Sequence, residues 1–256
     1  MLTGLHLRLN FARALAVVLF PAVLLVPHRS YAQSASAAET CLAVNQNLSL
    51  GAKLPRTAAI FKSRKLLKIV AIGSSSTVGL WMNDPAKTYQ GVMQTELMRL
   101  IPGAQMDIVN SGRNGDTIPG NIARFESDVF AHHPDLVIWQ MGGNDFTWME
   151  SGDSLEQKII GGIQMLKANG AEIILMDQQY TPMILATQYA KMQAAIASAA
   201  RQERVAYLPR FEMMHKAVDA GVPITSLAAW DGLHMSGEGY DCTGRVLARA
   251  IVAALK

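Results

Sequence analysis

The sequence predicts an α/β fold: a single domain built as a three-layer α/β/α sandwich around a parallel five-stranded sheet. Two observations lead to this prediction. Short apolar runs rich in Val, Ile and Leu alternate about five times with longer segments that carry apolar residues at helical spacing. The short runs are continuously apolar rather than alternating, which is typical of parallel strands covered by helices on both faces.

The predicted strands are short segments bounded by Gly, Pro or polar residues. They are residues 68–73, 106–109, 135–140, 172–176 and 205–208. The predicted helices are residues 88–100, 118–130, 155–168 and 187–202, with a last helix from Ser236 to the C-terminal region. Pro102-Gly103 and Asn169-Gly170 supply the stop signals after two of these helices.

The first 32 residues are predicted to be a signal peptide. Arg8 and Arg13 make the N-terminus positive, and an apolar run follows from Ala14 to Val26. This run of 13 residues is too short to span a bilayer comfortably, but it suits the apolar region of an export signal. The small side chains before Gln33 indicate cleavage after Ala32.

The predicted signal peptide implies where the protein is located and where its domain begins. The protein is expected to be periplasmic or secreted, with no stable membrane insertion once the signal is cleaved; an uncleaved N-terminal anchor is the alternative. A second candidate cleavage site lies at residues 35–37. Residues 33–65 are expected to form an irregular lead-in, and residues 66–256 the single domain.

Charge and cysteine content exclude several classes of protein. Three of the 23 basic residues and none of the 20 acidic ones lie in residues 1–32, so the rest of the chain is balanced. With no basic run, no nucleic-acid partner is expected. Two cysteines are too few for a disulfide scaffold. In an oxidising compartment Cys41 and Cys242 form either one bridge or two free thiols, and the sequence leaves both open.

Polar, Gly-containing segments follow three of the predicted strands and precede the last helix. They are residues 73–77, 110–117, 142–145 and 231–234. Sites in open α/β sheets form at the carboxyl ends of the strands. We therefore expect these four segments to meet at one edge of the sheet.

Nucleophilic chemistry at this edge needs a base, because a serine hydroxyl is a weak nucleophile on its own. His234 follows Asp231 by three residues, which allows the carboxylate to hold one ring nitrogen while the other points away. The alternative for this pair is an ordinary surface turn. His132, His133 and His215 are expected to be solvated or packed histidines. No residues show the spacing of metal ligands, so no metal is expected.

The serines at Ser74, Ser75 and Ser76 allow two interpretations. One of them is a nucleophile, or their hydroxyls cap a helix and bind phosphate, as in a flavodoxin-like protein holding FMN. Acyl transfer also needs donors for the oxyanion. Gly115 offers a backbone N–H and Asn144 a side-chain amide, although both residue types are also common in turns.

Taken in order, the four segments resemble the blocks of the SGNH (GDSL-like) hydrolases. The resemblance covers residues 67–256 and implies a flavodoxin-like parallel sheet and serine esterase activity. It places Ser75 as nucleophile and His234 as its base, with Asp231 orienting His234. It also implies an oxyanion hole formed by Ser75, Gly115 and Asn144, and no cofactor.

The first block departs from the family pattern. Gly-Ser-Ser-Ser replaces the usual Gly-Asp-Ser-Leu, so Ser74 stands where an Asp orders the loop and Ser76 where a Leu lies. These two serines are the fallback nucleophiles.

The expected substrate is a small-molecule or glycan ester, with short-chain or O-acetylated carbohydrate esters favoured. Lysophospholipase or thioesterase activity is the alternative within the family, and a binding module is the alternative outside catalysis. Four apolar residues near the first and third blocks either line an acyl or sugar pocket or belong to the core: Trp81, Met82, Trp148 and Met149.

Overall fold

The computed structural model describes Met1, residues 35–145 and residues 152–256. Residues 2–32 of the expected signal peptide lie outside the described residues. Residues 35–256 form one compact unit around a five-stranded parallel sheet with the strand order β2-β1-β3-β4-β5. The strands are β1 (Leu66–Gly73), β2 (Gln105–Gly112), β3 (Leu136–Gln140), β4 (Glu172–Met176) and β5 (Ala206–Leu208). The predicted fold class is confirmed, and the strand order is the flavodoxin-like one.

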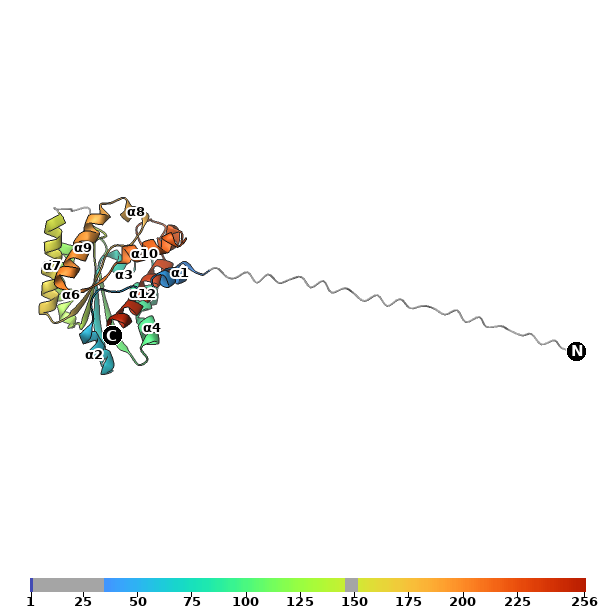
Figure 1. Cartoon of the computed structure of the whole chain (residues 1–256), viewed down its shortest axis with the longest axis horizontal. Coiled ribbons are helices and arrows are strands. Elements are labelled where there is room, and N and C mark those ends of the chain that lie inside the picture. Colours follow the sequence, from blue (N-terminus) through green and yellow to red (C-terminus); the bar gives the residue numbers. More distant parts are fainter. Residues whose placement is uncertain (2–34, 146–151) are drawn as a thin grey trace. The chain divides into compact units, whose positions relative to one another are not determined.

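Helices cover both faces of the sheet (Figure 1). The buried apolar side chains form two separate clusters, one on each face. The first cluster lies under α1 (Ala37–Val44), α2 (Pro55–Lys62), α4 (Tyr89–Leu100), α10 (Arg210–Asp219), α11 (Ile224–Leu227) and α12 (Gly237–Ala254). The second lies under α5 (Ile118–Ala123), α6 (Phe125–Asp128), η2 (Phe130–His132), α7 (Gly152–Ala168) and α9 (Tyr189–Glu203). Successive strand residues contribute to opposite clusters, as the period of two requires.

Three short helices lie in the connecting loops: α3 (Ser75–Val78), η1 (Pro85–Lys87) and α8 (Pro182–Leu185). α3 follows β1 directly and packs closely on the end of β2. A Cβ atom at Gly112 would overlap the backbone of Val78, so only glycine permits this approach.

The predicted helix at residues 118–130 is wrong as a single element. It is divided into α5, α6 and η2, with a break at Arg124, whose backbone angles (φ −114°, ψ 12°) are not helical. Inside this break the Arg124 side chain is 6% exposed and pairs with Asp116 and Asp128. These buried ion pairs outweigh the helical periodicity that the apolar residues suggested.

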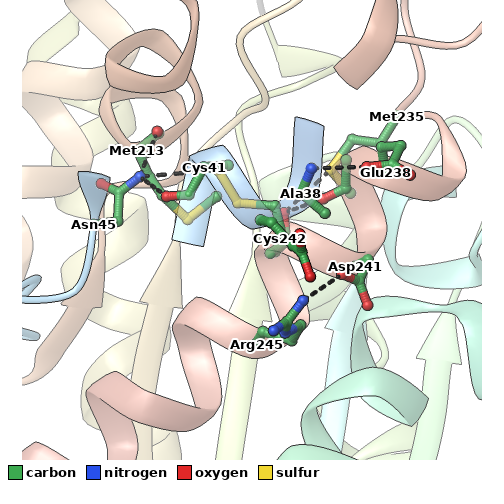
Figure 2. The surroundings of a disulfide bond; sticks show 12 residues. Ala38, Cys41, Asn45, Met213, Met235, Glu238, Asp241, Cys242 and Arg245 are labelled. Carbon is green, nitrogen blue, oxygen red and sulfur yellow. Dashed lines mark hydrogen bonds and ion pairs between the residues drawn. A yellow bond between two sulfur atoms is a disulfide. The ribbon is translucent and has the colours of Figure 1, made fainter. Parts of the chain in front are cut away.

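Residues 33–65, expected to be irregular, contain α1 and α2. A disulfide between Cys41 and Cys242 joins α1 to α12, with a Cα–Cα distance of 6.0 Å and a sequence separation of 201 residues (Figure 2). The Ala38 N–H donates to Glu238 Oε2 (2.7 Å), and the Asn45 amide donates to the Met213 carbonyl (2.9 Å). The N-terminal segment is therefore attached to the domain by a disulfide and by hydrogen bonds.

No helix within the described ranges is both long and apolar enough to cross a membrane.

Candidate active site

The Ser75 and His234 side chains meet at the carboxyl edge of the sheet. Ser75 begins α3, immediately after β1, and its Oγ lies 2.8 Å from His234 Nε2. His234 Nδ1 lies 2.6 Å from Asp231 Oδ2. All three side chains are largely buried, with Ser75 8% and His234 9% exposed. The serine oxygen, the ring and the carboxylate therefore form one continuous chain of hydrogen bonds.

The Asp231 carboxylate is held in its charged form by its surroundings. Burial by itself would raise its pKa, but hydrogen bonds from His234, Trp81 and Leu233 outweigh burial and bring the pKa well below its usual value. Oδ1 accepts the Leu233 and His234 N–H groups at 3.0 Å each. Oδ2 accepts the Trp81 indole N–H at 2.8 Å, in addition to the His234 ring. A fixed negative charge thus faces His234 Nδ1 and sets the orientation of the imidazole.

The serines on either side of Ser75 have hydroxyls directed at other partners. Ser74 donates its N–H (3.0 Å) and its hydroxyl (3.1 Å) to Gln140 Oε1, which also accepts from the Thr77 hydroxyl. Ser76 Oγ donates to Gln179 Oε1 at 3.1 Å. Among these three serines, only Ser75 has its hydroxyl on His234. The hydroxyls of Ser74 and Ser76 donate to side chains of the protein, whereas a phosphate site would need them to donate to the ligand.

Gln179 contacts both loops of the site. It follows β4, and its Oε1 accepts from Ser76 Oγ and from Arg210 Nη2 (3.0 Å), while its Nε2 donates to the Leu233 carbonyl (2.7 Å). Ser76 adjoins Ser75, and Leu233 adjoins His234. One buried amide therefore fixes the spacing between the two loops that supply the serine and the histidine.

Two charged side chains, Arg210 and Asp177, are buried next to the active site, and Arg210 donates to Gln179. Arg210 and Asp177 are 0% and 1% exposed. Burial lowers the pKa of Arg210, with the negative charge of Asp177 opposing that shift. Burial raises the pKa of Asp177 to about 6, and hydrogen bonds from Tyr207 and the Phe211 N–H limit the rise. Near neutral pH the Asp177 charge balances that of Arg210.

Gly115 and Asn144 lie in the loops that follow β2 and β3. Gly115 has φ +74°, and a Cβ there would meet no atom within 4 Å, so its backbone faces open space. Asn144 Nδ2 donates to the Asp116 carbonyl at 2.8 Å, which joins the two loops.

Asp145 and Arg124 hold the loops after β2 and β3 through hydrogen bonds. The Asp145 carboxylate is 4% exposed and accepts the Ile118 N–H (2.6 Å) and the Gly142 N–H (3.1 Å). Burial raises the pKa of Asp145 to about 6, although these backbone hydrogen bonds oppose the rise. Arg124 binds the Asp116 carboxylate (2.7 Å) and the Gly73 carbonyl (3.2 Å), so it ties the second loop to the end of β1.

The remaining candidates lie away from the reacting atoms or outside the described residues. His132 and His133 are exposed and sit at or beside η2, which precedes β3, and His215 on α10 stacks on Tyr180. Met82 packs against the first core cluster. Trp148 and Met149 lie outside the described residues. Trp81 contacts Asp231, so it belongs to the site.

Several residues that shape the site received no role from the sequence. They are Gln140, Gln179 and Arg210. The signal that would have found Gln179 is the rule used for the other loops, because Asp177-Gln178-Gln179 is a polar run directly after β4. Over the part of the chain that the structure describes, no group of three or more His, Cys, Asp or Glu side chains is arranged to hold a metal ion.

Known proteins are similar to this chain. The model of the non-GDSL lipase-like family matches residues 40–256. The esterase TesA of Pseudomonas aeruginosa is 26% identical over 143 residues, which is 56% of this chain and 70% of that protein. An arylesterase of Vibrio mimicus is 23% identical over 191 residues, which is 73% of this chain and 90% of that protein.

Solved structures show the same fold. A two-domain esterase active on acetylated mannans has a TM-score of 0.69 at 18% identity; the match covers 82% of this chain and 56% of that longer protein. An acetylxylan esterase from Geobacillus stearothermophilus has a TM-score of 0.59 at 22% identity, covering 74% of this chain and 94% of that one.

The family model spans most of the chain, and the curated relatives are an esterase and an arylesterase. The enzyme class is therefore that of the carboxylic ester hydrolases. The chain belongs to the non-GDSL lipase-like family, whose SGNH-type fold and block order the sequence resembled.

Proposed function

We propose that this chain cleaves carboxylic esters through an acyl-enzyme on Ser75, and that its substrates are short-chain or O-acetylated carbohydrate esters. The observation that carries the proposal is the unbroken hydrogen-bond chain from Ser75 Oγ through His234 to Asp231. The substrate class is supported by the solved relatives that act on acetylated mannans and acetylated xylan.

In the first step Ser75 Oγ attacks the ester carbonyl carbon, and its proton passes to His234 Nε2. The Asp231 charge stabilises the imidazolium that forms. The oxyanion accepts hydrogen bonds from the Ser75 and Gly115 N–H groups and from Asn144 Nδ2. The C–O bond to the alcohol then breaks, and His234 returns its proton to the leaving alkoxide.

In the second step water attacks the acyl-Ser75 carbonyl while His234 takes a proton from the water. The carbonyl re-forms, the acid leaves, and Ser75 regains its proton from His234. The whole cycle consumes one water and one ester and needs no cofactor.

Hydrolysis of p-nitrophenyl acetate, butyrate and octanoate by Ser75→Ala, Ser74→Ala and Ser76→Ala tests the nucleophile. We expect Ser75→Ala to lower kcat by on the order of 10⁴-fold or more, and the other two variants to remain active. The series of acyl lengths also measures the preference for short chains. An active Ser75→Ala together with an inactive Ser74→Ala or Ser76→Ala would assign the attack to the other serine.

Asn144→Ala tests the oxyanion hole. Loss of one donor of this kind costs on the order of 100-fold or more in kcat. Thermal unfolding of the variant verifies that the fold survives the loss of the bond to Asp116. Near-wild-type kcat would remove Asn144 from the mechanism.

The proposal also places the enzyme outside the cytoplasm, in the periplasm or the medium. It rests on the predicted signal peptide of residues 1–32. N-terminal sequencing of the protein recovered after expression of the full chain checks it. A mature N-terminus at Gln33 is expected, and recovery of an uncleaved chain in the membrane fraction would favour the N-terminal anchor instead.

A further inference from the structure

Two exposed tryptophans lie at the edge of the candidate active site. Trp81 is 47% exposed and Trp230 is 82% exposed. Their ring centroids are 5.2 Å apart and their planes are tilted by 54°. Trp230 immediately precedes Asp231, and Trp81 lies in the turn that follows α3. An exposed aromatic pair thus borders the loop that carries His234.

The Trp81 backbone is held in a conformation that bulky residues rarely adopt. Its φ is +73°, in the left-handed region. Such a conformation is strained and persists where the surroundings enforce it, often at functional sites. Here the indole N–H donates to Asp231 Oδ2 at 2.8 Å. That bond fixes one edge of the ring to the candidate catalytic carboxylate.

The exposed area is too small for a stable contact with another copy of the chain. Two indoles at these exposures present on the order of 300 Å². A specific protein interface buries about 800 Å² on each partner. A ligand the size of one or two sugar rings matches the area better. Its position beside Asp231 and His234 also places such a ligand within reach of the reacting ester.

We propose that Trp81 and Trp230 form a platform that binds the carbohydrate part of an acetylated oligosaccharide substrate. This inference rests on the proposed function and names the surface that recognises the alcohol moiety of the ester. A pyranose ring presents an apolar face of C–H groups, and the indole π face is electron-rich, so the two surfaces attract each other while the sugar hydroxyls remain in water.

The two rings take different parts in this platform. Trp81, bonded to Asp231, is the inner ring and contacts the sugar that carries the acetyl group. Trp230, the more exposed ring, contacts the next sugar along. Trp81 also positions Asp231, so its replacement affects both binding and turnover. Trp230 has an exposed ring, and its replacement tests binding more directly.

The first experiment measures binding without turnover. The Ser75→Ala variant is titrated with acetylated xylooligosaccharides, and binding is measured by calorimetry and by tryptophan fluorescence. The same titration is repeated with double variants that add Trp230→Ala, Trp230→Phe or Met98→Ala to Ser75→Ala. Met98 is a matched control, because it is 54% exposed and lies on α4. We expect Trp230→Ala to weaken binding at least five-fold, Trp230→Phe to retain most of it, and Met98→Ala to leave it unchanged.

The second experiment compares two substrates in the active enzyme. In Trp230→Ala, kcat/KM for acetylated xylooligosaccharides is expected to fall at least five-fold more than kcat/KM for p-nitrophenyl acetate, with the difference in KM. For Trp81→Phe, which keeps an aromatic ring but loses the N–H, we expect kcat to fall on both substrates.

Three outcomes would overturn the platform. The first is that Trp230→Ala binds the oligosaccharide as tightly as the chain that keeps Trp230. The second is that Met98→Ala weakens oligosaccharide binding as much as Trp230→Ala does. The third is that sedimentation shows a dimer that Trp230→Ala dissociates. The last outcome would assign this face to contact between copies. If the platform proposal is contradicted, the proposed function still holds as long as p-nitrophenyl acetate hydrolysis depends on Ser75. Loss of that dependence would instead contradict the proposed function itself.

Discussion

The loops that carry Ser75 and His234 are held in place by different kinds of interaction. The Ser75 loop is anchored from the core by two neutral amides: Gln140 accepts three hydrogen bonds from Ser74 and Thr77, and Gln179 accepts one from Ser76. The His234 loop is anchored by a charge. Its Asp231 carboxylate accepts two backbone N–H groups, the imidazole and the Trp81 indole.

This difference indicates that the positions of the two loops respond differently to the ionisation of the residues that hold them. Neutral amides do not titrate, so the position of the serine should not depend on the ionisation of the residues that hold it. The histidine depends on one carboxylate remaining charged. Gln179 joins the two systems, since it contacts Ser76 and the Leu233 carbonyl, and Arg210 lies beneath it.

The largest effect is expected from Asp231→Asn, which removes the charge but keeps the size of the side chain. An amide there supports the wrong tautomer of His234 and does not stabilise the imidazolium, so kcat should fall by on the order of 10⁴-fold. Steady-state hydrolysis of p-nitrophenyl acetate measures it. Asp241→Asn on α12 is the matched control, because Asp241 pairs with Arg245 near the surface (3.3 Å). A fall in kcat of less than ten-fold would show that the His234 loop works without the charge.

Arg210→Met is expected to cost the most stability. It removes a buried cation that donates to Gln179 Oε1 and whose charge lowers the pKa of Asp177, and losing such a buried hydrogen bond typically costs about 1–3 kcal/mol. Urea unfolding monitored by circular dichroism measures the free energy of unfolding. In the double variant Arg210→Met/Asp177→Asn both charges are absent, so part of the loss should be recovered. Equal free energies for the single and double variants would show that the two charges do not interact.

Gln179→Leu tests whether one amide sets the spacing between the loops. Leucine can bind neither Ser76 nor the Leu233 carbonyl, and a displacement of about 1 Å between reacting groups can lower kcat by about 100-fold. Gln178→Leu is a matched control: Gln178 is equally buried, but its amide donates to the Tyr189 carbonyl on α9. Both variants should lose stability, while only Gln179→Leu should lose kcat with little change in KM. The same kcat in both variants would assign Gln179 a purely structural role.

The sequence predicted the sheet well because its signals are local. Four of the predicted strands agree with β1, β3, β4 and β5 to within two residues at either end. The prediction for β2 ended three residues early, at Val109 rather than Gly112. β2 is an edge strand and continues through polar residues, so apolar content alone could not define its end.

The site was predictable only in part, for a physical reason. Ser75, Asp231, His234, Gly115 and Asn144 follow strands or precede a helix, and the parallel topology brings such positions together. The supporting residues depend on contacts across long sequence separations. Trp81 and Asp231 are 150 residues apart, and Gln179 and Ser76 are 103 apart. The polar run at residues 177–179 could have placed Gln179 at this edge of the sheet, but the sequence does not indicate the partners of Gln179 or Arg210.

The smallest effect concerns a third loop, held by the buried carboxylate of Asp145. Burial raises its pKa to about 6 from an ordinary value of 3.8, so the folded protein binds this proton more readily than the unfolded chain. Stability from this group therefore rises as the pH falls through 6, by about 1 kcal/mol between pH 7 and pH 5. Asp177 acts in the same direction. Asp231, whose pKa is lowered, loses its stabilising contribution only as the pH falls below about 4.

Urea unfolding at pH 7 and pH 5 measures this gain, and Asp145→Asn should reduce it because asparagine does not titrate. Asp177 contributes to the part that remains in the variant. An equal gain in wild type and Asp145→Asn would show that the carboxylate holding the Gly142 and Ile118 N–H groups stays charged at pH 5. In that case its two backbone hydrogen bonds outweigh burial, and the third loop is anchored by charge in the same way as the His234 loop.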